Sequence, residues 1–558
     1  MQNFILLVCC LCGLLCQSQK MPSALKITYM RTSNGKLVES QDPIVVFTDK
    51  TQTVVTSKTI IDKKSAFPFE QSVIDRKTLF NTQFAQLSKS KSTMTVDSVS
   101  IGKQSFESTP YTKMILSYKC RLAKTVINSN TFEIWYTETP KLKGAPSVLG
   151  QNLGLVLEVT RNGNFTVAAI KVEKLRSIPK SVIPERKKTA VDMLTYRDQL
   201  WKSRFIQIPI FKNETINFTD NFGSNDSILR FAKGTIVVRK IKMPKINKDS
   251  RIFVDATEQS AGDAYDRTGS IFFIPTDSKL SFLDGLKQTA GSLPVYDNGN
   301  GKKYQGVVRT SNYSPLLELM RFFTPFGIKQ YNAIQLKNKT WQDSVYYRQD
   351  ITDFAQVLDG NEVWIGANIA NYDSGGHKLS VNITVHPEDE RVPTDNFVLP
   401  LFNTTNVMEM AGQEYPTMFD TEKGLEVSFR LKSEIRNARL RYITTGHGGW
   451  ENGDEFVQKK NTILLDGVEV HSFIPWRTDC GSYRMYNPAS GNFNNGLSSS
   501  DYSRSNWCPG MATSPVYIAL GDLAAGDHTI QVKIPQGEPE GNSFSSWNVS
   551  GVLLGKAL

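Results

Sequence analysis

Apolar and polar residues alternate with a period of two along much of this chain, and β-branched residues are common at the apolar positions. Such alternation is typical of half-buried antiparallel strands, because successive side chains of a strand point to opposite faces. Helical periodicity is weak, and its best stretch is 314–323. We therefore expect an all-β protein built from several sandwiches. The clearest strand-like segments are 44–47, 51–56, 114–118, 131–136, 234–241, 270–275, 378–385, 425–431, 516–520 and 528–534.

Two stretches interrupt the strand pattern and divide the chain. Residues 176–212 contain Pro179, Pro184 and a Lys/Arg cluster, and residues 386–393 form a polar segment bracketed by prolines. Such stretches are typical of linkers. A chain of 558 residues is also too long for one hydrophobic core. We expect three folded domains after a leader at 1–19, namely a basic β-rich domain at 20–212 and two sandwiches at 213–386 and 387–558.

The first residues of the chain form an apolar run from Ile5 to Cys16, which is 12 residues long. A membrane-spanning helix needs roughly 20 apolar residues, so this run is typical of a signal peptide. The segment Gly13–Cys16 also resembles a lipoprotein box, which would tether the mature protein to a membrane through Cys16. We therefore expect an exported protein, located in the periplasm, on the outer-membrane surface or outside the cell, and the tether stays open.

The formal net charge of +11 is unevenly divided. Residues 21–212 contain 30 Lys/Arg and 15 Asp/Glu, whereas residues 213–558 contain 34 and 39. A basic half suits an anionic membrane surface, a nucleic acid or an acidic polysaccharide. Its lysines are scattered without a clustered patch, so a plain solvated surface fits equally well. Export argues against nucleic acid as a partner.

Three of the seven cysteines lie beyond the leader, at Cys120, Cys480 and Cys508. We expect Cys480 to pair with Cys508, because a stretch rich in Gly, Ser and Asn separates them and export favours oxidation. A link closing this loop of 28 residues should stabilise the fold by roughly 3–4 kcal/mol in the chain-entropy model. The remaining Cys120 is expected to be a small buried apolar residue.

Two polar loops bring carboxylates next to strand-like segments. One is 262–269, directly before the strand-like segment that starts at Ser270, and the other is 444–456, followed later by 502–511. Taken alone, an Asp-Arg pair in such a loop is most often a surface ion pair, and Gly-rich loops are most often turns. Neither loop indicates catalysis by itself.

Taken together, the loops contain four elements in a distinctive order. They are the Asp-x-x-Asp-Arg of 263–267, the Gly-x-Gly of 446–448, Glu455, and the Arg-x-x-Trp-Cys-Pro-Gly-Met run of 504–511. In order and approximate spacing, this set resembles the peptide-N-glycosidase F family, and the resemblance covers about 213–558. It implies two eight-stranded antiparallel jelly-roll sandwiches side by side, with the active site in the cleft between them. It also implies an amidase that hydrolyses the Asn–GlcNAc bond of N-glycoproteins, releasing the glycan and converting Asn to Asp.

The resemblance assigns catalytic roles to two carboxylates. Asp266 corresponds to the primary catalytic carboxylate, Arg267 to its substrate-orienting neighbour, and Glu455 to a second carboxylate contributed by the other sandwich. These residue types suit the reaction, since cleaving an amide needs a base for water, a donor for the departing nitrogen and stabilisation of the oxyanion. Catalysis should therefore depend on the contact between the two sandwiches.

The resemblance also assigns residues that bind the substrate. Arg504 and Trp507 are expected in the cleft near the first sugars, and His447 and Trp450 along the glycan-facing wall. The family's third acidic position corresponds to Asn368, which has no carboxylate. The change at Asn368 leaves a second interpretation open, a surface glycan-binding protein of the same fold that lacks catalysis, and Ala370 at the position of a family tryptophan points the same way.

No metal or nucleophile motif competes with this interpretation. The five histidines show no His-x-x-x-His spacing, and there is no paired Cys motif or Gly-x-Ser-x-Gly. We therefore expect no cofactor and no metal. The expected partners are N-glycosylated proteins or glycopeptides, and the protein is expected to be a monomer.

The N-terminal domain has a resemblance of its own. Its segments 118–120, 133–138 and 149–159 are similar to the exported GLPGLI family of Bacteroidetes proteins, although the central proline of that signature is absent. The resemblance implies a bacterial, exported origin and no particular activity.

Overall fold

The computed structural model describes residues 22–185, 189–247, 250–387, 396–404, 417–448, 453–492, 496–538 and 545–558. The leader and Cys16 lie outside these ranges. The chain divides into two compact units, Met1–Arg204 and Phe205–Leu558. Within the described ranges, no helix is both long and apolar enough to cross a membrane.

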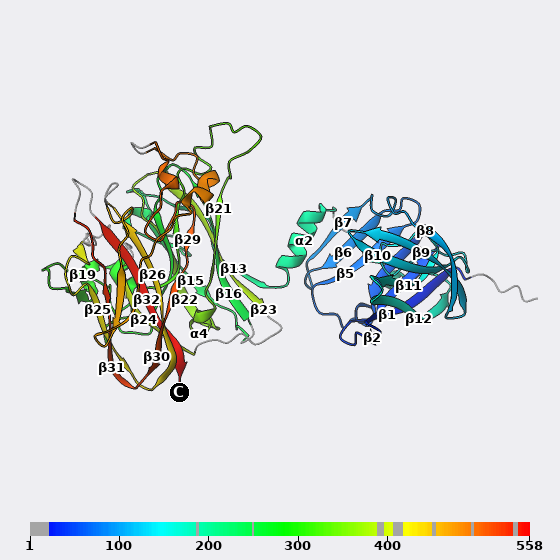
Figure 1. Ribbon diagram of the computed structural model, residues 1–558, viewed down its shortest axis with the longest axis horizontal. Coiled ribbons are helices and arrows are strands. Elements are labelled where there is room, and N and C mark those ends of the chain that lie inside the picture. The colour runs from blue at the N-terminus through cyan, green and yellow to red at the C-terminus, as the bar shows by residue number, and fades with distance from the viewer. Residues whose placement is uncertain are drawn as a thin grey trace, which may run out of the picture. The chain divides into compact units, whose positions relative to one another are not determined.

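The first unit is built on one antiparallel sheet of 12 strands, in the order β7-β6-β5-β4-β3-β1-β12-β11-β10-β9-β8, with β2 on β1 (Figure 1). Cys120 is buried in its core and is a free thiol, as predicted. Two helices accompany the sheet, α1 (Lys58–Ile61) and α2 (Met193–Lys202). The strands are β1 (Ala24–Ser33), β2 (Lys36–Leu37), β3 (Ile44–Asp49), β4 (Gln52–Ser57), β5 (Phe69–Asp75), β6 (Asn81–Gln86), β7 (Ser92–Asp97), β8 (Glu107–Ile115), β9 (Tyr118–Ile127), β10 (Asn130–Thr137), β11 (Leu155–Arg161) and β12 (Phe165–Leu175).

The second unit begins with a sandwich of two antiparallel sheets, β13-β23-β16-β21 and β14-β15-β22-β17-β20-β29. It has eight long strands and the short β14 and β29. The helices α3 (Phe282–Lys287) and α4 (Ala355–Leu358) and the two-stranded β18-β19 lie in its connections. The strands are β13 (Ile206–Ile216), β14 (Leu229–Phe231), β15 (Ile236–Lys242), β16 (Ser250–Ser260), β17 (Thr268–Ile274), β18 (Val295–Tyr296), β19 (Tyr304–Gln305), β20 (Leu317–Phe323), β21 (Val345–Asp350), β22 (Glu362–Ile369), β23 (His377–Pro387) and β29 (Ala512–Thr513).

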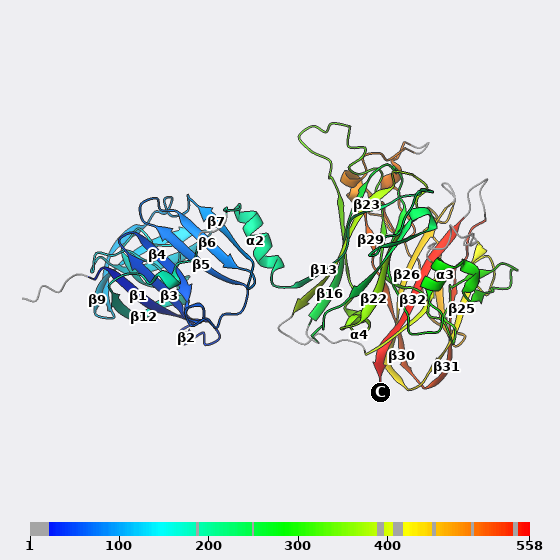
Figure 2. The same cartoon turned by 180° about the vertical axis from the view of Figure 1, so that it is seen from behind.

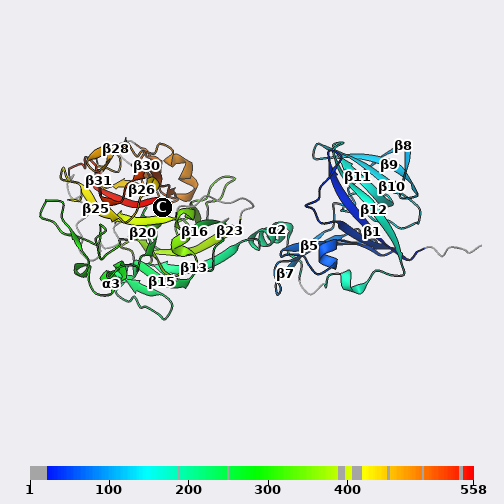
Figure 3. The ribbon, with the colours of Figure 1, turned by 90° about the horizontal axis from the view of Figure 1, so that it is seen from below.

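A second sandwich follows, with the sheets β24-β32-β26-β30 and β25-β31-β27-β28. Figures 2 and 3 show this eight-stranded sandwich beside the first. The all-β prediction and the two sandwiches after a separate β-rich domain are therefore confirmed. The strands are β24 (Phe397–Asn403), β25 (Leu425–Leu431), β26 (Ile435–His447), β27 (Asn461–Leu465), β28 (Val468–Phe473), β30 (Val516–Leu523), β31 (Gly526–Lys533) and β32 (Ser546–Ala557).

The segment 314–323, which has the best helical periodicity, contains no helix in the structure. Its last seven residues form β20, and all seven are buried. A strand that is covered on both faces has apolar residues at consecutive positions, so it loses the alternation that would identify it. The weak helical periodicity of this stretch therefore reflects its burial and does not indicate a helix.

The two sandwiches share a packed interface. Val552 and Leu554 of β32 belong to the hydrophobic core of the first sandwich. In addition, β29 comes from the C-terminal part of the chain but pairs with β20, with Phe322 opposite Ala512. The second sandwich thus completes both the core and a sheet of the first.

Buried arginines reinforce this interface. The guanidinium of Arg321 is fully buried, with Nη2 2.7 Å from Oε2 of Glu318, and its Nη1 donates to the carbonyl of Asn548 on β32 at 2.6 Å. From the other side, Arg441 of β26 donates to the carbonyl of Glu318 at 3.0 Å. Both arginines therefore bond across the sandwich boundary, which fixes the two halves of any site placed there.

Candidate active site

The turn that contains the Asp-x-x-Asp-Arg motif connects β16 to β17. Thr324, which follows β20, secures this turn, because its hydroxyl donates to the carbonyl of Tyr265 at 3.0 Å and accepts from the amide of Arg267 at 2.7 Å. At the other end, the hydroxyl of Ser260 donates to the carbonyl of Asp263 at 2.5 Å. The turn is thus held at both ends, and Asp266 lies inside it.

Asp266 and Glu455 meet on one guanidinium, that of Arg504. Its Nη2 lies 3.3 Å from Oδ2 of Asp266, and its Nη1 forms an ion pair with Oε1 of Glu455. Arg504 is 1% exposed, whereas the side chains of Asp266 and Glu455 are 16% and 17% exposed. The carboxylates can therefore be reached from solvent while the cation between them is buried. The structure brings together the three residues that the motifs predict, from both sandwiches.

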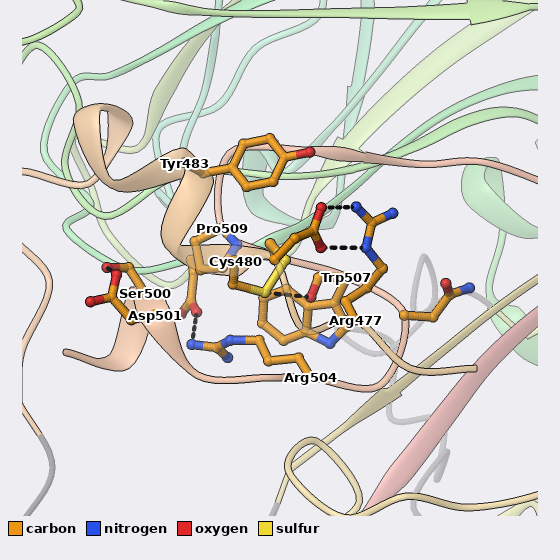
Figure 4. Close-up of a disulfide and its surroundings, with 12 residues drawn as sticks. Arg477, Cys480, Tyr483, Ser500, Asp501, Arg504, Trp507 and Pro509 are labelled. Carbon is orange, nitrogen blue, oxygen red and sulfur yellow. Dashed lines mark hydrogen bonds and ion pairs between the residues drawn. A yellow bond between two sulfur atoms is a disulfide. The ribbon is translucent and has the colours of Figure 1, made fainter. Parts of the chain in front are cut away.

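The segment around the disulfide holds Arg504 in place. Nη2 of Arg504 donates to the carbonyl and the hydroxyl of Ser499 at 2.8 and 3.0 Å, and its guanidinium carbon lies 4.4 Å from the ring centroid of Trp507. The predicted Cys480–Cys508 disulfide is present. Figure 4 shows the disulfide beside the ring of Trp507, with Arg504 along it.

Burial sets the electrostatics of the pair. Burial raises the pKa of the Asp266 carboxyl, while Arg504 and Arg267 act in the opposite direction. Burial likewise lowers the pKa of Arg504 to about 10, against the effect of Asp266, so Arg504 remains a cation at neutral pH. A carboxyl with a raised pKa that still faces a cation is suited to act as a base near neutral pH.

Trp507 and His447 lie beneath the site. Trp507 is 2% exposed, its indole nitrogen donates to the carbonyl of Gly446 at 2.9 Å, and its ring stacks on Phe323 with centroids 4.2 Å apart. His447 bonds to the hydroxyl of Thr445 at 2.8 Å. Burial, together with the charges of Arg321 and Arg504, lowers the pKa of His447 to about 3. The imidazole is therefore neutral, and the buried indole packs against Arg504.

Close packing explains the first glycine of the Gly-x-Gly motif. A Cβ on Gly446 would lie 2.8 Å from the carbonyl of Asp454 and 2.9 Å from the side chain of Ser505. Glycine therefore lets β26 run close to the segments that carry Glu455 and Arg504. The other aromatic residue assigned to the glycan-facing wall, Trp450, lies outside the described residues.

Asn368 supports the sheet beside the turn. It is 4% exposed on β22, pairs with Ser270 across the sheet, and donates its amide to the carbonyl of Thr235 at 3.1 Å. Its side chain is therefore engaged with the backbone. The contact between Asp266, Glu455 and Arg504 forms without a third acidic residue at Asn368.

Arg267 lies on the exposed side of the turn. Its Nε donates to Oδ2 of Asp263 at 2.7 Å, and its guanidinium carbon lies 5.0 and 5.8 Å from the ring centroids of Tyr265 and Tyr372. These two tyrosines are 62% and 51% exposed. They place aromatic faces beside Arg267, and neither tyrosine is among the residues predicted from the sequence.

Among the described residues, no group of three or more His, Cys, Asp or Glu side chains could hold a metal ion. The residues of the site that can move protons are the two carboxylates. One carboxylate from each sandwich, beside a fixed cation, can provide the base and the binding group of a hydrolase.

Comparisons with known proteins identify its family. The chain matches three family models: "N-glycanase peptide, N-terminal domain" at 27–198, "Peptide-N-glycosidase F, N terminal" at 207–385 and "Peptide-N-glycosidase F, C terminal" at 414–554. Two solved structures of PNGF-II, in different crystal forms, are 54% identical to it and cover 96% of this chain. They are themselves covered to 98% and 100%, with TM-scores of 0.89 and 0.91. A comparison with curated proteins gives no match.

The chain belongs to the peptide-N-glycosidase F family, whose members are amidases. The resemblance of 213–558 to this family is therefore confirmed. In the N-terminal domain, residues 27–198 match the N-terminal domain of N-glycanase peptides. This family model takes the place of the resemblance to GLPGLI proteins.

Proposed function

We propose that this site hydrolyses the amide bond between an asparagine side chain and the first GlcNAc of an N-glycan. The observation that carries the proposal is the contact of Asp266 and Glu455, from different sandwiches, with the single buried guanidinium of Arg504. Membership of the amidase family supports it. The products are the released glycosylamine and a polypeptide with aspartate at the cleavage site.

Asp266 acts as the base. Its carboxylate takes a proton from a water molecule while the water oxygen bonds to the amide carbon, and the C–N bond then breaks as the departing nitrogen receives that proton. The raised pKa of Asp266 strengthens it as the base in the first of these proton transfers, because a base works best when its pKa is near the working pH. Arg267, which is partly exposed beside Asp266, orients the amide and stabilises its developing negative charge.

Glu455 binds the sugar. An ionised carboxylate accepts charge-assisted hydrogen bonds from sugar hydroxyls, and Glu455 keeps enough exposure to do so while Arg504 fixes its position. Arg504 and Trp507 are buried, so they are positioning residues. All of these side chains belong to one chain, which supports a monomer as the active form.

The alternative is a protein that binds glycans without cleaving them, suggested by Asn368 and Ala370. Two observations favour hydrolysis over binding alone. Asn368 bonds to the backbone of the sheet, and the pair of carboxylates assembles without it.

The test is a glycopeptide incubated with the full-length protein in water enriched in oxygen-18. Hydrolysis converts Asn to Asp with one solvent oxygen incorporated, which mass spectrometry detects. Asp266→Ala should reduce release by roughly 100-fold or more, because it removes the general base. Asp527→Ala is the matched control, since this exposed aspartate forms a surface ion pair with Arg430. An intact glycopeptide after incubation with the wild type would favour binding alone, and an active Asp266→Ala variant would exclude Asp266 as the base.

We also propose that the protein acts in an oxidising compartment outside the cytoplasm. The Cys480–Cys508 disulfide next to Arg504 supports this location, because such bonds persist mainly in exported proteins. The apolar run at 5–16 supports it independently.

A further inference from the structure

Behind the turn with Asp266 lies a row of four ionisable side chains. Glu258 on β16 and His377 at the start of β23 are fully buried, with Oε1 of Glu258 2.8 Å from Nδ1 of His377. Nε2 of His377 lies 3.5 Å from Oδ2 of Asp263, which is 1% exposed. The same Oδ2 accepts from Nε of Arg267 at 2.7 Å. We call Glu258, His377, Asp263 and Arg267 the buried charge row.

Acidic and basic groups alternate along the row, and burial raises the pKa of Glu258 at its inner end, against the effect of His377. Although burial lowers the pKa of His377, the nearby carboxylates of Asp263 and Glu258 raise it to about 9, so its imidazole is a cation at neutral pH. Burial raises the pKa of Asp263, but His377 and Arg267 outweigh it and lower the pKa to about 2. Charges this deep are stable only when each has a partner. The position of each member therefore depends on the next.

The backbone links the row to the turn as well. The carbonyl of Gly376, next to His377, accepts from the amides of Ala261 and Asp263 at 2.8 and 3.3 Å. Oδ1 of Asp263 accepts from the amide of Tyr265 at 3.0 Å. A movement of His377 is thus transmitted both to the turn and to the guanidinium at its end.

We propose that His377, held by Glu258, is a positioning residue for the amidase reaction, acting through Asp263 to fix Arg267 beside Asp266. This inference rests on the proposed function. Apolar residues can replace a buried ion pair without loss of stability, so packing alone does not require the row. Its partly exposed end is Arg267, whose neighbour in the chain is the proposed base.

The expected consequence is a loss of rate through misplacement. With His377 replaced by glutamine, Asp263 loses a cationic partner and Arg267 loses its fixed position. A displacement of about 1 Å at a reacting group costs on the order of 100-fold, so we expect kcat/KM to fall by roughly 10- to 100-fold, mainly in kcat. Glu258→Gln should cause a smaller loss in the same direction.

A pH profile separates positioning from damage to the fold. The charged groups around Asp266 are Arg504 and Arg267, which lower its pKa, and Asp263, which raises it. Glu455 also lies on the guanidinium of Arg504. A displaced Arg267 therefore lets the pKa of Asp266 rise further. Because the reaction uses the ionised form, the acidic limb of kcat/KM should move to higher pH in His377→Gln. A smaller folded fraction would lower the whole profile without moving this limb.

The decisive experiment is a double-mutant cycle with the full-length protein and an N-glycopeptide. If His377 acts through Arg267, then His377→Gln should lower kcat/KM by less than about threefold when Arg267 is already replaced by alanine. His528→Gln is the matched control, because His528 also lies 2.8 Å from a carboxylate, that of Asp466, but on β31. It should leave kcat unchanged.

Three results would overturn the inference: an equal loss in both backgrounds, an unshifted acidic limb, or an Arg267→Ala variant as active as the wild type. Thermal unfolding accompanies each assay. If His377→Gln does not fold, Glu258→Gln is tested in the same cycle, and failure of both to fold would assign the row to stability alone. Wild-type release is measured first. A wild type that releases no glycan refutes the proposed function. If the wild type is active and the losses caused by His377→Gln and Arg267→Ala multiply in the double variant, only the role of His377 is refuted.

Discussion

Replacing Arg504 by methionine should damage stability and activity together. Methionine keeps much of the length and volume but removes the cation between Asp266 and Glu455 and the two hydrogen bonds to Ser499. Breaking a buried ion pair costs about 3–5 kcal/mol, because the remaining charge has no partner. Since both carboxylates are 16–17% exposed and partly hydrated, we expect about 3 kcal/mol.

Arg504→Lys tests geometry apart from charge. A lysine ammonium is a compact point charge and cannot reach both carboxylates as the planar guanidinium does. We expect it to lose about 1 kcal/mol of stability and nevertheless to lower glycan release by roughly 100-fold. Arg430→Met is the matched control, because Arg430 and Asp527 form a pair whose side chains are 76% and 74% exposed. It should cost under about 1 kcal/mol.

The free energies of unfolding are measured by urea denaturation and glycan release on the same preparations. Because the chain has two compact units, the data are fitted with two transitions, and only the one that belongs to 205–558 should shift. An Arg504→Met protein as stable as Arg430→Met, or one that releases glycan within about threefold of the wild-type rate, would refute the reasoning that Arg504 holds the two carboxylates.

Two further predictions concern stability. Replacing Cys480 and Cys508 by serine should lower the free energy of unfolding by roughly 3–4 kcal/mol, since the link closes a loop of 28 residues; calorimetry that shows under about 1 kcal/mol would contradict this. The raised pKa of His377, about 9 against an ordinary 6.5, contributes stability that is fully present below pH 6.5 and is lost as the pH rises through 9. Unfolding measured across this window should show a decline in the wild type that His377→Gln lacks, and parallel curves would count against a charged imidazole.

Much of the fold is predictable where one face of a strand is covered and the other is open. The alternation at 378–385 falls within β23, and that at 425–431 coincides with β25. Such alternation is absent from β20, which is covered on both faces. The helix α2 was not predicted either, and its N-terminal cap by Asp192 lies inside the stretch interpreted as a linker. The alternation of apolar and polar residues reflects which face of a segment is exposed to solvent. That exposure depends on which other parts of the chain pack against the segment.

Likewise, only part of the site could be predicted from the sequence. The motifs predict Asp266, Glu455 and Arg504, but not that Arg504 is buried between the two carboxylates. Glu258 and His377 carry no local signal, because they are 119 residues apart in the sequence and meet only through the pairing of β16 with β23. Such contacts follow from strand register, which single-sequence patterns leave open.

The pairing of β29 with β20 also orders events in time. The chain has been made as far as Asp266 long before Arg504 and Ala512 exist, and the sheet that contains β20 lacks its last strand until then. During synthesis from the N-terminus, most strands of the first sandwich can pair early, but its second sheet stays incomplete until β29 has been made. The site is therefore complete only after the segment with Arg504 and Ala512 has been synthesised. A nascent chain that lacks this segment should have no hydrolytic activity.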